Sequence, residues 1–197
     1  MDKTIFTIGH SNHDISDFIN LLLANQIELV IDVRSAPYSK LYPHFNRNPL
    51  EVSLTKNSIK YTFLGDSVGG RSNNIKDYSK GRVMYKKIAE KKEYISSINT
   101  MIQNSSKYKI VLMCSEKEPL ECHRTLLISR SIETHMVKIL HIHRDGQIES
   151  QSEAIQRLLK IWKLDSPNLF GEDAERIDEA FTKQESKYAY FDENKIV

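Results

Sequence analysis

Short apolar runs alternate with amphipathic segments along most of the chain. The apolar runs, rich in β-branched and aromatic residues, predict strands, and the segments with apolar positions three and four apart predict helices. The predicted strands span residues 3–9, 27–33, 59–65, 108–113 and 137–143. The predicted helices span residues 13–26, 48–58, 83–104, 119–135 and 151–164. Strands that alternate with helices indicate a parallel sheet that is covered on both faces.

The predicted fold class is therefore α/β: a Rossmann-like open parallel-sheet three-layer sandwich with a C-terminal helical appendage. Residues 144–150 predict a turn into a hairpin arm. Residues 65–82 are polar and Gly-rich, and predict a long loop of the kind that is often functional. The helix at 83–104 is expected to pack through five apolar residues: Ile88, Tyr94, Ile95, Ile98 and Met101.

The composition after Leu164 is polar, with an amphipathic centre at Ile177, Ala180 and Phe181. We therefore expect an α/β domain over residues 1–150, followed at 151–197 by a C-terminal helix and tail that packs on the domain or on a partner.

The composition narrows the class of protein. With 197 residues, 40% of them hydrophobic, the chain can bury one full core. A net charge of +2 does not by itself predict nucleic-acid binding. No apolar run approaches the roughly 18 residues of a membrane span, and the N-terminus does not have the pattern of a signal peptide. Two cysteines do not make a disulfide scaffold, so we expect a cytoplasmic protein with reduced thiols and no membrane partner.

Most of the chemically versatile residues follow the predicted strands directly. Ligands of open parallel sheets bind outside the carboxyl ends of the strands, so these residues are expected to gather at one edge. The candidate catalytic residues are Cys114, Glu116, His123 and Asp32. The candidate ligand-binding residues are His10, Ser11, Arg34, Ser39, Gly70, Arg71, Cys122 and Arg124.

The stretch CSEKEPLECHR at 114–124 holds both cysteines around one strand-to-helix turn. A helix N-terminus and Arg124 would lower the pKa of a thiol at Cys114, while Glu116 would oppose them or act as a general acid or base. The same turn could instead bind a phosphate. Burial as a small apolar residue explains Cys114 equally well, and Cys122 could simply pack in its helix.

A metal site is an alternative at the same turn. Cys114, Cys122 and His123 could supply three zinc ligands, with His10 or His141 as the fourth. The spacing differs from that of short Cys-x-x-Cys zinc motifs, and neighbouring residues on a helix point about 100° apart. The sequence therefore predicts no metal ligands and requires no cofactor, with zinc as a lesser alternative.

Two further pairs have both structural and functional explanations. Asp32 and Arg34 share one face of a strand, and on spacing alone an ion pair that fixes the next loop is the better explanation. Gly70 and Arg71 could let the backbone approach a phosphate while the guanidinium binds it, or could form an ordinary turn.

Four motifs taken together resemble the domain of unknown function 488 family. They are TIGHS at 7–11, IDVRSAPYS at 31–39, FLGDSVGGR at 63–71 and CSEKEPLECHR at 114–124, and the resemblance spans roughly residues 4–143. The family often continues the second motif as Ser-Arg, whereas Lys40 follows Ser39 here. The family has no settled activity, but the resemblance implies that one site contains His10, Asp32, Arg34, Gly70, Arg71, Cys114, Glu116, Cys122, His123 and Arg124.

A second, weaker resemblance is to rhodanese-like domains, which also show an IDVR-like strand end and a later cysteine. In that family the cysteine begins a loop of backbone N–H groups that holds an anion. The corresponding loop here, CSEKEPLEC, is acidic and contains no glycine.

The favoured hypothesis is an intracellular enzyme, a hydrolase or a transferase, that acts on a nucleotide, another phosphorylated small molecule or a nucleic acid. In this hypothesis Arg34, Arg71 and Arg124 hold phosphate beside the cysteine. One alternative is a rhodanese-like sulfur or phosphoryl transferase with a Cys114 thiolate.

The other alternative is a non-catalytic binding module, such as a subunit of a defence or repair complex. Its tail would contact the partner through Phe170, Phe181, Tyr188, Tyr190 and Phe191. A monomer and a homodimer are both compatible with the sequence.

Overall fold

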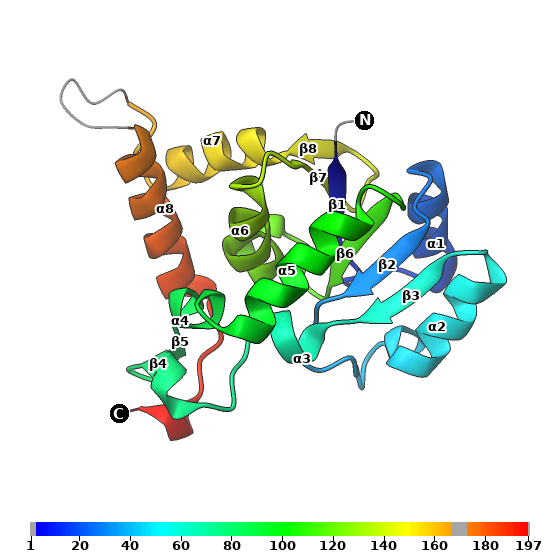
Figure 1. Ribbon diagram of the computed structural model, residues 1–197, viewed down its shortest axis with the longest axis horizontal. Helices are drawn as coiled ribbons and strands as arrows, with labels where there is room; N and C mark the ends of the chain where they lie inside the picture. The colour runs from blue at the N-terminus through cyan, green and yellow to red at the C-terminus, as the bar shows by residue number, and fades with distance from the viewer. Residues whose placement is uncertain (1–2, 167–172, 197) are drawn as a thin grey trace.

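The computed structural model describes residues 3–166 and 173–196, and its centre is a six-stranded sheet (Figure 1). The strand order is β3-β2-β6-β1-β7-β8; the first five of these strands are parallel, and β8 runs antiparallel to β7. The strands are β1 (Thr4–Gly9), β2 (Leu29–Asp32), β3 (Lys60–Phe63), β6 (Ile110–Cys114), β7 (Lys138–Ile142) and β8 (Ile148–Ser150).

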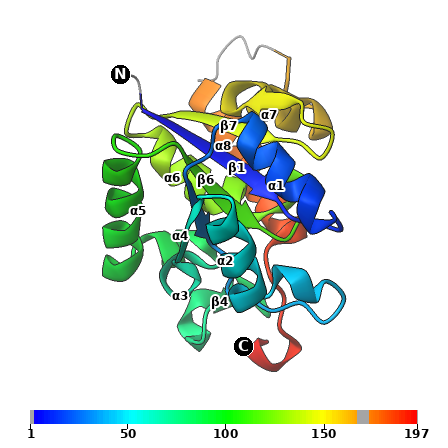
Figure 2. The ribbon, with the colours of Figure 1, turned by 90° about the vertical axis from the view of Figure 1, so that its right-hand side faces the viewer.

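Helices cover both faces of this sheet (Figure 2). The helices α1 (Ile15–Ala24) and α2 (Arg47–Lys56) pack on one face. The opposite face is covered by α5 (Lys92–Asn104), a helical segment over Arg124–Glu133, and α7 (Gln151–Ile161). The predicted α/β three-layer sandwich is confirmed. None of the described helices is both long and apolar enough to cross a membrane.

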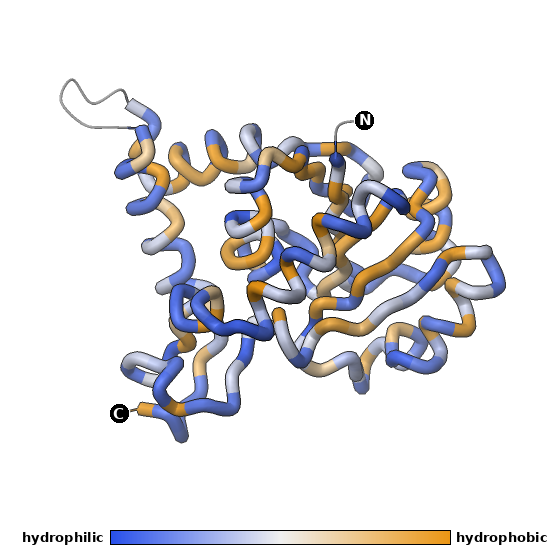
Figure 3. Tube along the Cα trace, viewed as in Figure 1, coloured by the Kyte–Doolittle hydropathy of each residue, from blue (hydrophilic) through white to orange (hydrophobic). Residues whose placement is uncertain are grey.

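The central strand shows how the sequence produces these layers. All five residues of β6 are buried, as expected for a parallel strand that is covered on both sides. The strands of the central sheet contain many hydrophobic residues (orange in Figure 3). Val111 and Met113 pack toward α1 and α2, whereas Leu112 and Cys114 pack toward α5. The alternation therefore aims the Cys114 side chain at the α5 face of the sheet.

The predicted hairpin arm at 144–150 is confirmed as a turn into β8. Ser150 ends that strand and also caps α7, because its side chain accepts from the Glu153 N–H while Glu153 accepts from the Ser150 N–H.

The predicted helix at 83–104 is wrong in one respect, because it is two helices. The helix α4 (Tyr85–Ala89) ends before Lys91, whose backbone is extended, and α5 follows. The Lys91 ammonium pairs with the buried carboxylate of Asp77, and this contact holds the chain at the break. Four of the five predicted packing residues are buried, but Ile95 is 48% exposed.

The predicted loop at 65–82 contains more regular structure than its composition suggested. It holds the short helix α3, a 3-10 turn and a small hairpin beside α4. These elements are α3 (Gly65–Val68), the turn Ile75–Asp77, β4 (Tyr78–Ser79) and β5 (Arg82–Val83). Buried hydrogen bonds order it: Ser72 bonds to Asp77, and the Tyr78 hydroxyl donates to the Ser72 carbonyl at 2.8 Å.

The C-terminal helix α8 (Asp173–Tyr188) packs against α7 and the 119–129 segment (Figure 1). Ala180 and Phe181 lie in the core, and the Gln184 amide donates to the Leu120 carbonyl at 2.8 Å. Beyond the helix, Phe191 bridges to Arg82 of β5, and a last 3-10 turn spans Glu193–Lys195. Phe170, expected to contact a partner, lies outside the described residues.

Candidate functional site

The ends of β1, β2 and β6 meet at one edge of the sheet, and the predicted site residues form two groups there. One group, Asp32, Arg34 and His10, lies toward α1 and α2 with Phe45. The other, Cys114, Glu116, Cys122 and His123, lies toward α5 and the 119–129 segment; we call it the Cys/Glu/His cluster.

Asp32 and Arg34 form a buried bidentate ion pair. Arg34 Nε lies 2.9 Å from Asp32 Oδ1, and Nη2 lies 2.6 Å from Oδ2. The same Nη2 donates to the Phe45 carbonyl at 2.9 Å, and Tyr61 donates its hydroxyl proton to Asp32 at 2.8 Å. Most of the donors of Arg34 are thereby occupied, and the pair fixes the loop that follows β2.

His10 completes this first group as a neutral side chain. Its ring stacks on Phe45 with 4.3 Å between centroids, Nδ1 bonds to the Ser11 carbonyl, and Nε2 accepts from Arg34 at 3.1 Å. Burial, and then the charge of Arg34, lower the pKa of His10 to about 4. The group is thus a supporting network rather than a set of free ligand contacts.

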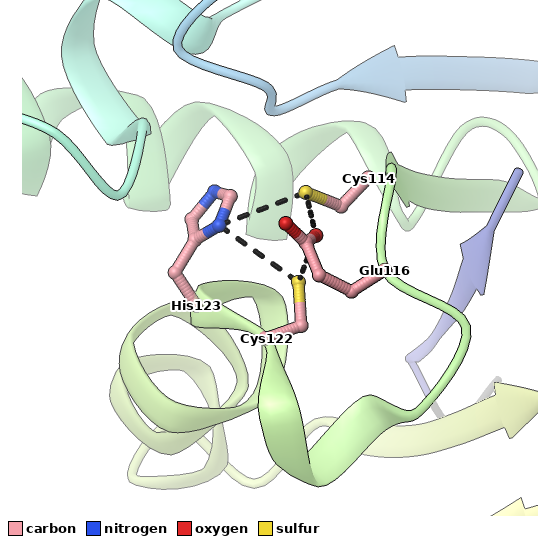
Figure 4. A group of neighbouring side chains, drawn as sticks. All are labelled: Cys114, Glu116, Cys122 and His123. Atoms are coloured by element: carbon pink, nitrogen blue, oxygen red, sulfur yellow. Dashed lines mark hydrogen bonds between the residues drawn. The ribbon is translucent and has the colours of Figure 1, made fainter. Parts of the chain in front are cut away.

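The Cys/Glu/His cluster is compact (Figure 4). Glu116 Oε2 lies 2.8 Å from Cys114 Sγ and 3.0 Å from Cys122 Sγ. His123 Nδ1 lies 3.6 Å from the first sulfur and 3.8 Å from the second. One donor atom from each of the four residues lies within 4.8 Å of the other three. These are the described side chains best placed to hold a metal ion.

A break in the predicted helix at 119–135 creates this convergence. Pro119–Glu121 is a 3-10 turn, Cys122 is extended with φ −131° and ψ 142°, and a π-helix at Arg124–Ser129 leads into α6 (Arg130–Glu133). The expectation that Cys122 and His123 point about 100° apart assumed an unbroken helix and is wrong for that reason. The extended residue lets neighbouring side chains reach one point.

The orientation of His123 is set by two contacts on opposite sides of the ring. Nε2 lies 2.9 Å from the Val33 carbonyl and donates to it, so Nδ1 faces the sulfurs and holds the lone pair whenever the ring is neutral. Burial lowers the pKa of His123, but Cys122 and Glu116 raise it above its usual value. Gly70 lies against the ring, where a β-carbon would be 2.9 Å from His123 Cβ and Cγ. Gly70 therefore makes room for the imidazole.

Gly9 allows a second close approach at the same edge. A β-carbon there would lie 1.8 Å from the Glu116 carbonyl oxygen. The glycine of the TIGHS motif thus lets β1 lie directly beside the loop that carries Glu116.

Electrostatics concentrate negative charge in the cluster. Burial would raise the pKa of Glu116, but His123 and hydrogen bonds from both sulfurs lower it to about 2. Burial raises the pKa of Cys114 well above its usual range. Burial acts on Cys122 in the same direction, but a hydrogen bond from Cys114 and the charge of Arg124 lower its pKa. Cys122 therefore ionises more easily than Cys114.

These positions bear on the rhodanese-like alternative, which needs a thiolate at Cys114. The helix N-terminus faces the other cysteine: the Arg124 N–H donates to Cys122 Sγ at 3.4 Å. Buried Cys114 receives no such donor among its hydrogen bonds. The geometry thus favours Cys122 as the more anionic sulfur.

Arg124 is buried and binds the backbone of the loop between the two cysteines. Its side chain is 0% exposed, and its guanidinium donates to the carbonyls of Glu116 at 2.5 Å and Lys117 at 3.2 Å. It holds the loop between the two cysteines and is not placed to meet a ligand. Ser11 and Ser39 also make local bonds, to Asn12 and to the Tyr42 N–H respectively.

A cavity of about 300 Å³ opens beside the cluster. Cys114, Glu116 and His123 lie in its wall, together with Gly70. The rest of the wall includes two arginines and four tyrosines: Arg34, Arg71, Tyr38, Tyr85, Tyr188 and Tyr190. Arg71 extends over the Tyr190 ring, with 4.3 Å from the guanidinium carbon to the ring centroid.

Comparison with known protein families identifies the family of the chain. The model of the family described as Domain of unknown function DUF488 matches residues 14–131, more than half of the chain. The chain belongs to this family. The matched residues of the DUF488 protein include the whole Cys/Glu/His cluster. No curated protein and no solved structure matches the chain.

The structure adds wall residues that the motifs did not single out. Ser35 and Tyr38 lie inside the IDVRSAPYS motif, and Ser35 Oγ accepts from the Arg71 N–H at 3.1 Å. Tyr85 and Glu121 also line the cavity, but no pattern marks Tyr85 in the sequence. Tyr188 and Tyr190, which the binding-module alternative assigns to a partner surface, line this cavity.

Proposed function

We propose that this DUF488 protein is an enzyme that acts on a nucleotide or nucleic-acid substrate, with the Cys/Glu/His cluster as its reacting end. The observation that carries the proposal is the composition of the single cavity beside the cluster. Its wall combines aromatic rings, one exposed arginine and the three cluster residues Cys114, Glu116 and His123.

The tyrosines suit a nucleobase. Aromatic rings stack on bases with little sequence preference, and arginine adds to such stacks. Tyr38 is 70% exposed at the mouth, Tyr85 is buried, and Tyr190 carries Arg71 over its ring. A cavity of about 300 Å³ is at the small end for ligand pockets and suits a nucleoside-sized group.

Arg71 is the best-placed phosphate ligand. Its side chain is exposed at the cavity and its backbone is fixed by Ser35. Arg34 also lines the wall, but its guanidinium is occupied by Asp32, His10 and the Phe45 carbonyl. Because Glu116 and Glu121 add negative charge to the wall, the site favours a single phosphate group over a polyphosphate.

Glu116 supplies the negative charge that the cluster presents to the cavity. Its carboxylate is ionised near neutral pH and faces the cavity beside both sulfurs. A carboxylate with a pKa of about 2 is a weak base, so its part is to accept a hydrogen bond from water or from a substrate hydroxyl and to hold that group beside the sulfurs.

Calorimetric titration with the four ribonucleoside monophosphates and with short single-stranded oligonucleotides tests the binding step. Arg71→Ala is expected to weaken binding about tenfold or more, the usual scale of a charge-assisted contact of about 1.5–3 kcal/mol. Arg71→Lys retains the charge, and Arg144→Ala removes an exposed arginine outside the cavity, so both serve as controls. Equal binding by the wild type and Arg71→Ala would contradict the proposal.

Glu116→Gln separates an enzyme from a binding module. Once a ligand is found, this variant is expected to bind it while turnover falls about tenfold or more, the usual scale of a hydrogen bond to a charged group of about 1.5–3 kcal/mol. Unchanged turnover would remove Glu116 from the mechanism, and no turnover by the wild type with any bound ligand would favour the binding module.

A further inference from the structure

The donor atoms of the Cys/Glu/His cluster form a metal-sized cage. We propose that Cys114, Cys122, His123 and Glu116 bind one divalent transition-metal ion, zinc above others. The inference goes beyond the proposed function, because it concerns the four residues themselves and does not depend on which substrate enters the cavity. Glu116 faces the sulfurs through Oε2, so when that oxygen binds the ion the other carboxylate oxygen still accepts a hydrogen bond from the ligand.

The donor types select the class of ion. Two sulfurs, one imidazole nitrogen and one carboxylate oxygen suit zinc and related transition metals. Magnesium and calcium bind oxygen ligands and have no use for the sulfurs. The two sulfur ligands therefore disfavour magnesium and calcium at this cluster.

The distances fit tetrahedral coordination. Zinc–sulfur bonds of about 2.3 Å and zinc–nitrogen bonds of about 2.0–2.1 Å place sulfur and nitrogen about 3.5–3.6 Å apart at the tetrahedral angle. The two observed separations are 3.6 and 3.8 Å. Glu116 Oε2 is closer to the sulfurs, at 2.8 and 3.0 Å, and must withdraw by roughly 0.6–0.8 Å to become the fourth ligand.

Neighbouring backbone groups orient the donor atoms of the cluster, as hydrogen bonds to metal ligands do in known metal sites. The Val33 carbonyl accepts the Nε2 proton of His123, which leaves Nδ1 to coordinate. The Arg124 N–H donates to Cys122 Sγ at 3.4 Å and stabilises a thiolate there. Both contacts are already present, so binding requires little rearrangement beyond Glu116.

Charge balance permits loading of this site, in which Cys114, Cys122 and His123 are buried and Glu116 is exposed. A dication that displaces the two thiol protons forms two metal–sulfur bonds and releases two protons to solvent, so the net charge of the cluster does not change. The guanidinium of Arg124 is buried beside the cluster, and within the described residues it makes no salt bridge to a carboxylate. It offsets the negative charge of the coordinated Glu116.

Metal analysis of the full-length chain tests the proposal. After expression with added zinc and purification without chelators, elemental analysis is expected to find one zinc per chain. His123→Gln is expected to lower zinc affinity by more than about tenfold. His135→Gln removes an exposed histidine far from the cluster in sequence and is expected to retain full loading.

Cobalt substitution and thiol labelling report on the ligands directly. Cobalt(II) is expected to produce sulfur-to-metal charge-transfer absorption and strong visible bands of a tetrahedral site. In the wild-type chain, zinc is expected to protect both cysteines from alkylation until a chelator is added. This measurement uses the wild-type chain alone, so it does not depend on whether a variant folds. Equal metal content in wild type and His123→Gln, alkylation unaffected by zinc, or a Cys114–Cys122 disulfide in the purified chain would each overturn the proposal.

Discussion

Gly70 packs against the imidazole of His123, and a β-carbon at position 70 would lie 2.9 Å from two atoms of that side chain. Gly70→Ala is therefore expected to displace the ring from Val33 and to cost about 1–3 kcal/mol in the free energy of unfolding. Urea denaturation of Gly70→Ala, His123→Gly and the double variant measures the coupling, because only glycine at position 123 removes both contacted atoms. The cost of Gly70→Ala should largely vanish in the His123→Gly background, and a cost that persists there would contradict the assigned contact.

The Asp32–Arg34 pair predicts a large effect from a small chemical change. Asp32→Asn leaves the buried guanidinium of Arg34 without its counter-charge and is expected to destabilise the fold by about 3–5 kcal/mol. Asp178→Asn breaks the exposed Arg130–Asp178 pair and is expected to cost at most about 1 kcal/mol. Similar midpoints of chemical denaturation for the two variants would refute this reading of the buried pair.

Two buried neutral histidines predict loss of stability in acid. Burial, and then Arg124, lower the pKa of His141 from 6.5 to about 4, and His10 is shifted similarly by burial and Arg34. Between these pH values the unfolded chain binds protons that the folded chain does not. Their contribution is thus fully present above pH 6.5 and is lost as the pH falls toward 4.

The His141 contribution can be isolated by substitution. Its ring bridges Thr7 and Gln151 at 2.8 and 2.9 Å, contacts that a glutamine amide can replace. His141→Gln is expected to reduce the slope of unfolding free energy against pH in this window by up to about 1.4 kcal/mol per pH unit. Denaturation series at several pH values measure this slope, which should change if the ring is neutral in the folded chain.

The C-terminal helix is expected to contribute to stability through Phe181, which is 1% exposed. Phe181→Ala should cost about 3–5 kcal/mol because it opens a cavity between α8 and its neighbours. Ile95→Ala is the control, since that side chain is half exposed on α5 and should change stability by no more than about 0.5 kcal/mol. Thermal unfolding of both variants checks the difference.

The sequence predicted the parts of the fold that depend on local patterns. The five parallel strands and the covering helices follow from apolar periodicity, and the common edge follows from the rule that parallel strands end together. The expectation that Cys114, Glu116 and His123 share one edge of the sheet required only that rule and the turn after β6.

The remaining features depend on contacts between distant parts of the chain. The break at Cys122 accompanies a bond from Gln184 to the Leu120 carbonyl and an ion pair between Glu118 and Arg157. No sequence pattern within residues 119–135 predicts that Gln184 and Arg157 bind this segment. In the same way, the break before α5 depends on the pairing of Lys91 with Asp77, fourteen residues earlier in the chain.

The Cys/Glu/His cluster and part of the cavity wall come from separate stretches of the chain. The cluster lies within the residues that match the family, whereas Tyr188, the last residue of α8, and Tyr190 just after it lie beyond them. Substitutions in the C-terminal segment can therefore change the shape of the cavity without altering the cluster. Under the proposed function, ligand preference and chemistry would then vary independently, as they do where variable loops are carried by a constant scaffold.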